Sequence, residues 1–199
     1  MNCYSPNEAE LRLLQEKIAA SDQSAFRQLF TIYSKKLIQF AASIVKSGDA
    51  AREIVDEVFI KIWRKRTAAA GIQNLRVYLY TATKNTALNY LATRARENIA
   101  EPFDFFAVQL SDEGPSPEKQ LINTELLRKI QGAIEELPPR CKMVFKLVRE
   151  DGLSYKEVGQ VLNISPKTVD AQMVIAVRQI SEKVRLDFDC FPNRNLKKN

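Results

Sequence analysis

Apolar side chains recur every three or four residues along most of this chain, the spacing that places them on one face of an α-helix. The clearest run extends from Ala25 to Val45, and others cover Glu8 to Ala19, Ala50 to Arg64 and Leu75 to Arg94. No stretch follows the two-residue period of a strand. The pattern predicts an all-α protein whose residues 21–96 form a three-helix bundle, with the N-terminal helix as a fourth.

The predicted helix from Leu75 to Arg94 differs from the others in composition and in pattern. Its apolar stripe begins with Leu75 and Leu79, but Leu88 and Leu91 drift away from that side. Aromatic and amide side chains crowd the same segment, a composition that offers stacking surface and hydrogen bonds together. These are Tyr78, Tyr80, Asn85, Asn89 and Tyr90.

The stretch from Leu153 to Ser181 predicts a helix-turn-helix. Ser154 followed by Glu157 is a capping box that opens the first short helix, Asn163 tolerates a left-handed turn, and Ser165 caps the second helix. In such a motif the second helix places its first turns in a DNA major groove. The predicted buried stripe of this second helix consists of Val169, Met173, Ala176, Val177 and Ile180.

Between residues 99 and 119 the helical period fails, and proline, glycine and acidic residues predict a linker. Two helical domains are therefore expected, at residues 1–98 and 120–186, followed by a tail at 187–199.

Charge supports this division. Residues 21–99 carry 13 basic and 6 acidic side chains, and residues 127–199 carry 14 and 9, whereas residues 100–126 carry 1 and 6. Two basic blocks joined by an acidic connector are expected of modules that each face a polyanion. A solvated surface is the alternative that charge alone leaves open.

Composition excludes several classes of chemistry. The chain has no histidine, and Cys3, Cys141 and Cys190 lie far apart, so neither a zinc site nor a histidine-based triad is expected. We expect no metal, no cofactor and no catalytic residues. No apolar run has the length of a membrane span and no leader pattern opens the chain, which predicts a cytoplasmic protein.

Four segments in order carry a family resemblance: AFRQLFTIYSKKLIQFA, EIVDEVFIKIW, LRVYLYTATKNTALNYL and ELPPRCKMVFKLVREDGLSYKEVGQVLNISPKTV. Over roughly residues 8–185 the chain resembles the extracytoplasmic-function (ECF) sigma factors of bacterial RNA polymerase, which keep only sigma domains two and four. The resemblance implies promoter-specific transcription initiation, with core RNA polymerase and promoter DNA as partners. It also makes an anti-sigma factor a candidate partner.

By this resemblance, the helix matching residues 50–64 docks on the largest polymerase subunit. Its outward face would present Glu53, Asp56, Glu57, Ile60 and Lys61. A mixed acidic and apolar stripe suits a contact between helices, although a solvated helix face has the same appearance. Phe59 and Trp63 are expected in the core.

The resemblance assigns the next helix and the loop before it to the minus-ten promoter element. Opening DNA requires aromatic and amide groups that hold an unstacked base. The predicted contacts are Gln73, Asn74, Tyr78, Lys84, Asn85 and Asn89. For Asn85, a buried structural amide is the alternative, and Tyr78 could serve packing.

The second helix of the helix-turn-helix matches the part of the family that reads the minus-thirty-five element. The predicted contacts are Ser165, Lys167, Thr168, Asp170, Ala171, Gln172 and Arg178. Glutamine suits adenine and aspartate suits cytosine, so Asp170 and Gln172 are expected to determine promoter choice. Backbone phosphate contacts are expected from Arg64, Lys65, Arg66, Arg94, Arg96, Arg140, Lys142 and Lys156.

The main alternative is a stand-alone helix-turn-helix regulator of the response-regulator output type, whose DNA-binding module would resemble residues 138–185. A receiver domain requires alternating strands and helices, and residues 1–99 predict no strand. An adaptor that binds only other proteins would not need a basic bundle joined to a recognition helix. An enzyme is disfavoured because neither a glycine-rich phosphate loop nor a paired-carboxylate pocket is found.

Overall fold

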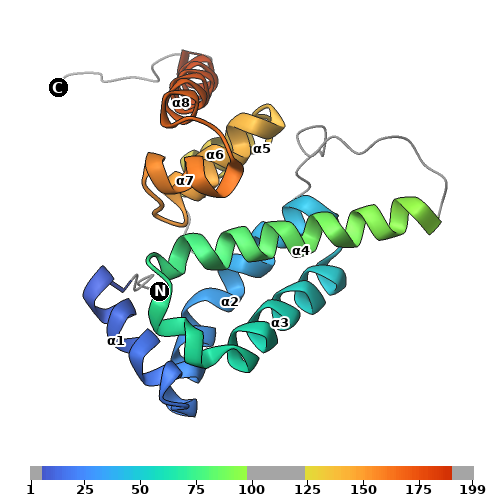
Figure 1. The fold of residues 1–199 in the computed structure, drawn as a ribbon. Helices are drawn as coiled ribbons and strands as arrows, with labels where there is room; N and C mark the ends of the chain where they lie inside the picture. Colours follow the sequence, from blue (N-terminus) through green and yellow to red (C-terminus); the bar gives the residue numbers. More distant parts are fainter. Residues whose placement is uncertain (1–5, 98–123, 190–199) are drawn as a thin grey trace.

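The computed structural model describes residues 6–97 and 124–189, and all regular elements in these ranges are helices (Figure 1). The all-α prediction is confirmed. The predicted linker lies outside the described residues, as do Cys3, Cys190 and residues 190–199 of the predicted tail, whereas residues 187–189 belong to the last helix. The elements are α1 (Glu8–Ala19), α2 (Gln23–Val45), α3 (Gly48–Arg64), a 3-10 helix η1 (Arg66–Gly71), α4 (Leu75–Glu97), α5 (Thr124–Glu135), α6 (Pro139–Arg149), α7 (Tyr155–Leu162) and α8 (Pro166–Asp189).

Helices α1–α4 form the first unit, and their boundaries follow from capping chemistry. Asn7 and Glu10 form a capping box at the start of α1. The Asp22 side chain accepts hydrogen bonds from the backbone of Ser24 and Ala25 and opens α2. The interior is filled by side chains that each helix projects toward its neighbours. Its fully buried members include Leu29, Leu37, Ala51, Val55 and Leu79.

Helices α5–α8 form the second unit, in which α7, a tight turn and α8 make the predicted helix-turn-helix. Ser154 and Glu157 form the expected capping box. Asn163 adopts the left-handed conformation, with φ 57°, and its backbone turns the chain toward α8. The Ser165 hydroxyl accepts a hydrogen bond from the Thr168 N–H at 3.0 Å, which caps α8. Each of these local predictions is confirmed.

One predicted core residue of α8 is not in the core. Val177 is 43% exposed, and its neighbour Val174 is 61% exposed, so the prediction that Val177 is buried was wrong. Val169, Met173 and Ala176 are buried as expected. The reason is geometric. Val169, Met173 and Ala176 lie on one narrow side of α8, and Val177 follows Ala176 by about 100° around the helix axis, which places it at the edge of that side.

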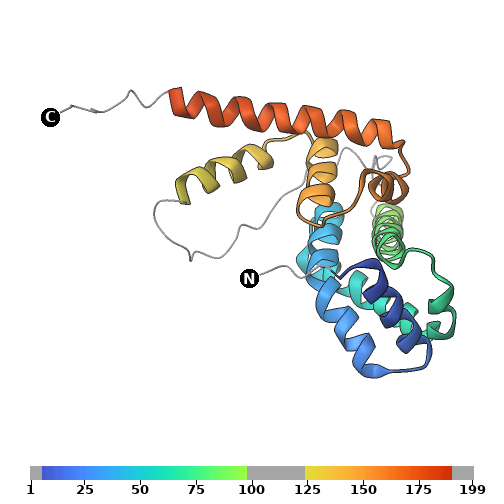
Figure 2. The same cartoon turned by 90° about the vertical axis from the view of Figure 1, so that its left-hand side faces the viewer.

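The two units pack against each other through α4 and α7. Figure 1 shows α7 beside α4, and in Figure 2 α8 extends across the top of the molecule, away from the first bundle. Buried apolar side chains form one continuous cluster that runs from Leu11 in α1 to Met173 in α8. The domains expected from the sequence are therefore in direct contact within the described residues.

Gly159 of α7 provides a test of the helix-turn-helix packing. A Cβ built at this position would lie 2.8 Å from the backbone oxygen of Ile164, whereas one built at Gly132 of α5 meets nothing within 4 Å. Gly159→Ala should therefore destabilise the protein by about 1–3 kcal/mol through overpacking. Gly132→Ala should stabilise it by about 1 kcal/mol, because alanine is the better helix former. Urea unfolding followed by circular dichroism measures both, and equal effects would contradict the turn geometry.

Candidate polymerase and nucleic-acid interfaces

The outward face of α3 is exposed within residues 6–97 and 124–189, and Lys61 forms an ion pair with Glu57 along it. Glu53, Asp56, Glu57 and Lys61 are exposed, and Ile60 is 50% exposed. Phe59 lies on the opposite side of the helix and is buried against the rings of Phe26 and Phe30. The residues predicted to meet the polymerase therefore form one accessible stripe, and Phe59 is confirmed as a core residue.

The loop before α4 is fixed by a buried glutamine of α1. Gln15 is 5% exposed, and its amide nitrogen donates to the backbone oxygens of Ala69 at 3.0 Å and Ile72 at 2.8 Å. Both donors of one side chain thus bind η1 and the residue that follows it. A buried amide with satisfied donors holds the loop at a defined distance from α1. Sequence reasoning missed Gln15, because a glutamine inside an apolar stripe gives no sign of its distant partners.

The amides expected on α4 project outward. Asn85 and Asn89 are exposed, and so is Tyr78, at 38%. Asn85 is therefore not a buried structural amide. Gln73, Tyr78 and Asn85 line a shallow pocket of about 470 Å³ together with Gln160 of α7. The aromatic and amide groups of the predicted minus-ten surface thus lie on one face of the helix, beside the helix-turn-helix.

Asn74 has two structural partners. Its side-chain oxygen accepts from the Val77 N–H at 3.0 Å, as at a helix N-terminus. Its amide nitrogen donates to the Glu157 carboxylate in α7 at 3.0 Å. Burial alone would raise the pKa of Glu157, but hydrogen bonds from Ser154 and Asn74 lower it overall. The charged carboxylate therefore joins the capping box of α7 to the start of α4.

Lys84 also forms a hydrogen bond with α7. Its ammonium donates to the backbone oxygen of Val161 at 2.7 Å, and burial lowers the pKa of Lys84. A carbonyl in the last turn of a helix has no intrahelical donor, and lysine is a favourable partner for it. The cation predicted to reach DNA is thus bound to the second unit in this structure.

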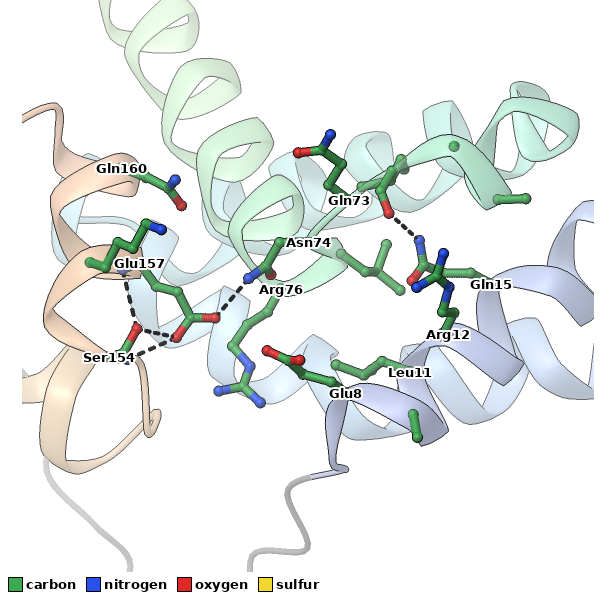
Figure 3. Close-up of a pocket in the computed structure, with 16 residues that line it drawn as sticks. Glu8, Leu11, Arg12, Gln15, Gln73, Asn74, Arg76, Ser154, Glu157 and Gln160 are labelled. Atoms are coloured by element: carbon green, nitrogen blue, oxygen red, sulfur yellow. Dashed lines mark hydrogen bonds between the residues drawn. The ribbon is translucent and has the colours of Figure 1, made fainter.

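A polar cleft of about 1070 Å³ opens between α1, the residues before α4 and the start of α7. Figure 3 shows Arg12 and Gln15 on one side of it, Gln73 and Asn74 at its rim, and Ser154 and Glu157 on the other. The Arg76 guanidinium donates to the backbone oxygen of Gly152 at 3.0 Å. The guanidinium groups of Arg12 and Arg76 and the amides of Gln15, Gln73, Asn74 and Gln160 therefore line one cleft next to the loop held by Gln15.

The recognition face of α8 is accessible, with one exception. Gln172 is half-buried, and its side-chain oxygen accepts a hydrogen bond from the buried thiol of Cys141 at 2.9 Å. In this structure Gln172 therefore points toward α6 rather than outward, which corrects its predicted position on the exposed turns. The remaining predicted residues are exposed, namely Ser165, Lys167, Thr168, Asp170, Ala171 and Arg178.

Two of the predicted phosphate contacts have partners within the chain. Lys142 is 1% exposed and forms an ion pair with Glu135, so it is not available to DNA. Arg66 donates to the Ser21 hydroxyl at 2.8 Å, and its guanidinium stacks over Trp63. A side chain's charge does not indicate whether it is buried, which is why sequence reasoning misassigned Lys142. Arg66 is half-buried, and its contact with phosphate stays a prediction. The other predicted phosphate contacts are exposed: Arg64, Lys65, Arg94, Arg96, Arg140 and Lys156.

No cluster of potential metal ligands occurs among the described residues. Within residues 6–97 and 124–189, every helix is too short or too polar to traverse a bilayer.

Comparisons with known proteins place both units in one family. Residues 29–97 match the family described as Sigma-70 region 2, and residues 127–180 match Sigma-70, region 4. The chain is 29% identical over 180 residues to the ECF RNA polymerase sigma-E factor of Escherichia coli strain K12, covering 87% of this chain and 94% of that protein. The sigma-E factor of Haemophilus influenzae is also 29% identical, with 86% and 94% covered.

Two solved structures share the fold. CnrH in complex with the cytosolic domain of CnrY superposes with a TM-score of 0.56 at 20% identity, covering 89% of this chain and 99% of that one. The sigma factor RpoE of Bartonella quintana in complex with the anti-sigma factor NepR gives a TM-score of 0.58 at 20% identity, with 81% and 98% covered. The two helical units, in this order, define a sigma-70-type initiation factor. The chain belongs to the ECF sigma factors, which direct RNA polymerase to promoters.

Lys142 and Arg149 are basic residues of the same helix, α6, and together they test the correction made for Lys142. Lys142→Met should lower the free energy of unfolding by about 1–3 kcal/mol, because it removes the buried partner of Glu135, while the Lys146 ammonium, at 3.5 Å, remains beside that half-buried carboxylate. Arg149→Met removes an exposed side chain at the end of α6 and should change stability by less than about 0.5 kcal/mol. Chemical denaturation measures both variants. A stable Lys142→Met protein with weakened DNA binding would restore Lys142 as a phosphate contact.

Proposed function

We propose that this sigma factor binds core RNA polymerase through α3, anchors on the minus-thirty-five element through α8, and opens the minus-ten element with α4 and the loop before it. The observation that carries this proposal is the grouping of exposed side chains into three separate faces. One face is acidic and apolar, one is amide-rich and aromatic, and one has the layout of a recognition helix.

The α3 face suits a helical protein partner. Ile60 supplies apolar area at its centre, and the acidic side chains around it suit a basic surface on the partner. The first unit, predicted at residues 1–98, thus has a protein-binding face on α3 and a DNA-binding face on α4. These faces lie on different helices, so both partners can be bound at once.

The face on α4 suits an unpaired DNA strand. Tyr78 offers an exposed ring for stacking, and Asn85 and Asn89 are one helical turn apart and both exposed. The loop held by Gln15 lies next to this face and supplies Gln73. A base that leaves the duplex would find a ring, amides and a fixed loop together.

The second unit, predicted at residues 120–186, reads duplex DNA. Asp170 is exposed on the second turn of α8, where its carboxylate can accept from the amino group of cytosine. Lys167 and Arg178 suit guanine or phosphate. Because Gln172 is bonded to Cys141, Asp170 is the stronger source of promoter choice in this conformation.

The chain itself performs no chemistry in this proposal. It lowers the free energy of opened promoter DNA relative to closed DNA, and the polymerase makes the bonds. The proposed site of action is the cytoplasm, where polymerase and promoters meet. The CnrY and NepR complexes of the two related folds support an anti-sigma protein as a regulatory partner.

Run-off transcription tests the function and the polymerase face together. The purified chain with core polymerase should produce promoter-specific transcripts, and neither component should do so alone. Ile60→Glu should reduce binding to core polymerase at least tenfold, because it places a charge at the centre of the contact. Leu13→Glu, a matched change at a 52% exposed leucine of α1, should have no effect. Tight binding of the free chain to one duplex, without redirected transcription, would favour the stand-alone regulator.

Asn85→Ala tests the minus-ten face. In reconstituted holoenzyme this variant should lose about 0.5–1.5 kcal/mol of open-complex stability, since one hydrogen-bonding partner of an unpaired base is removed. Permanganate reactivity of unpaired thymines measures opening, and duplex binding at the minus-thirty-five element serves as an internal reference. Gln28→Ala, an exposed amide of α2, is the control. Equal opening by Asn85→Ala and Gln28→Ala would show that Asn85 does not touch the strand.

A further inference from the structure

The thiol of Cys141 in α6 lies beneath the recognition helix α8. Cys141 is 3% exposed, and its thiol donates a hydrogen bond to the side-chain oxygen of Gln172 at 2.9 Å. We propose that Cys141 is a positioning residue for promoter recognition, because its thiol keeps Gln172 turned toward α6 and thereby limits the preference of this sigma factor for adenine in the minus-thirty-five element. This inference rests on the function proposed for α8.

The surroundings of Cys141 make its thiol a hydrogen-bond donor. Leu137, Cys141 and Ala176 form a small buried apolar cluster where α6 meets α8, and Phe145 packs against it. An ionised thiol would lose its hydration there, and burial accordingly raises the pKa of Cys141. The thiol therefore stays protonated at neutral pH, and the oxygen of Gln172 is the acceptor for its proton.

Gln172 lies on the part of α8 that is proposed to read bases. It follows the exposed Thr168 by one helical turn and comes directly after the exposed Ala171. Gln172 is itself half-buried, so its side chain lies at the border between the cluster around Cys141 and the accessible face of the helix. Rotation about its side-chain bonds can therefore turn the amide outward without moving α8.

The inward and outward orientations of Gln172 differ in what they can read. An outward glutamine binds adenine with both ends of its amide, since the oxygen accepts from the N6 amino group and the nitrogen donates to N7. An amide whose oxygen is bonded to Cys141 faces α6 and cannot place both ends against a base edge. The apparent affinity for adenine is then reduced by the fraction of molecules in which Gln172 is turned outward.

The strength of the thiol donor determines the size of this effect. A thiol is a weak donor, and the net contribution of one hydrogen bond is modest because water competes for both partners. The bond to Cys141 is thus strong enough to bias the orientation of Gln172 without fixing it. Loss of the bond should change the preference for adenine by about threefold to tenfold. A hydroxyl in the same place should bias Gln172 inward more strongly.

Two substitutions at Cys141 should act in opposite directions. Cys141→Ala removes the donor, so Gln172 turns outward more often and the preference for adenine rises. Cys141→Ser supplies a stronger donor at the same place, so the preference should not rise. Val144→Ala is the control for loosened packing of α6, because Val144 is 1% exposed on the same helix but belongs to the larger apolar cluster, which excludes Cys141.

Selection of promoter DNA by holoenzyme measures the preference directly. The full chain and core polymerase are mixed with promoter fragments whose minus-thirty-five region is randomised, and sequencing of the bound fragments gives the preference for each base at each position. We expect Cys141→Ala to gain a preference for adenine of about threefold to tenfold at a single position. Cys141→Ser and Val144→Ala should show no such gain, and the other positions should keep the wild-type preferences.

Gln172→Ala shows whether the gain depends on Gln172. Combined with Cys141→Ala, it should remove the whole gain in preference for adenine, because no amide is left to turn outward. The two substitutions are therefore expected to be non-additive. A purely structural effect of Cys141→Ala on the position of α8 would persist in the double variant.

Three outcomes would overturn the role of Cys141. The Cys141→Ala holoenzyme could select the same sequences as the wild type. Cys141→Ser or Val144→Ala could produce the same gain, which would attribute it to packing. The gain could also persist in the double variant with Gln172→Ala. If Cys141→Ala fails to fold, Cys141→Val, which is also apolar and without a donor, takes its place under the same criteria.

Asp170→Ala separates this failure from a failure of the proposed function. Asp170 is exposed on α8 and has no part in the contact between Cys141 and Gln172. Altered selection by Asp170→Ala, with unaltered selection by Cys141→Ala, would retain α8 as the reading helix and reject Cys141 as a positioning residue. Unaltered selection by both variants would reject the reading of the minus-thirty-five element by α8.

Discussion

Helix α4 packs against both units at once, on α2 and α3 of the first and α7 of the second, and the arrangement of the two units depends on this double packing. One side of α4 buries Leu75, Leu79 and Tyr80 against α2 and α3, while another side meets α7. This explains the irregular apolar stripe of its sequence, in which Leu88 and Leu91 depart from the side set by Leu75. A helix with one apolar face would have completed the first bundle and left the helix-turn-helix without a surface to pack on.

Buried polar groups determine the local geometry around this helix. The Gln15 amide donates hydrogen bonds to two backbone oxygens of the loop before α4. Glu157, part of the capping box of α7, accepts a hydrogen bond from Asn74 in the first unit. The Lys142–Glu135 ion pair has the same function inside the second unit, between α5 and α6. Because an unsatisfied buried polar group is costly, each of these contacts selects one arrangement among several that apolar packing alone would permit.

Local signals in the sequence were sufficient for the fold but insufficient for parts of the site. The caps at Ser154 and Ser165 and the left-handed Asn163 were predictable because each depends on residues within a few positions of it. Partners distant in sequence were not predictable. Lys142 and Arg66 were expected at DNA because they are basic, and Gln172 was expected outside because of its place in the helical period. Their partners Glu135, Ser21 and Cys141 are identified only when the chain is folded.

The hydrogen bond from Lys84 to the end of α7 has a consequence for the ion atmosphere of the protein. DNA binding releases about one counterion for each phosphate that a cation neutralises, and the slope of affinity against salt concentration counts those cations. Lys84 is unavailable while it is bound to Val161, and Arg76 is partly occupied by Gly152. With these hydrogen bonds in place, the chain displays a smaller effective charge toward DNA than its composition provides. It would associate less with random genomic sequence, leaving more of it available to polymerase.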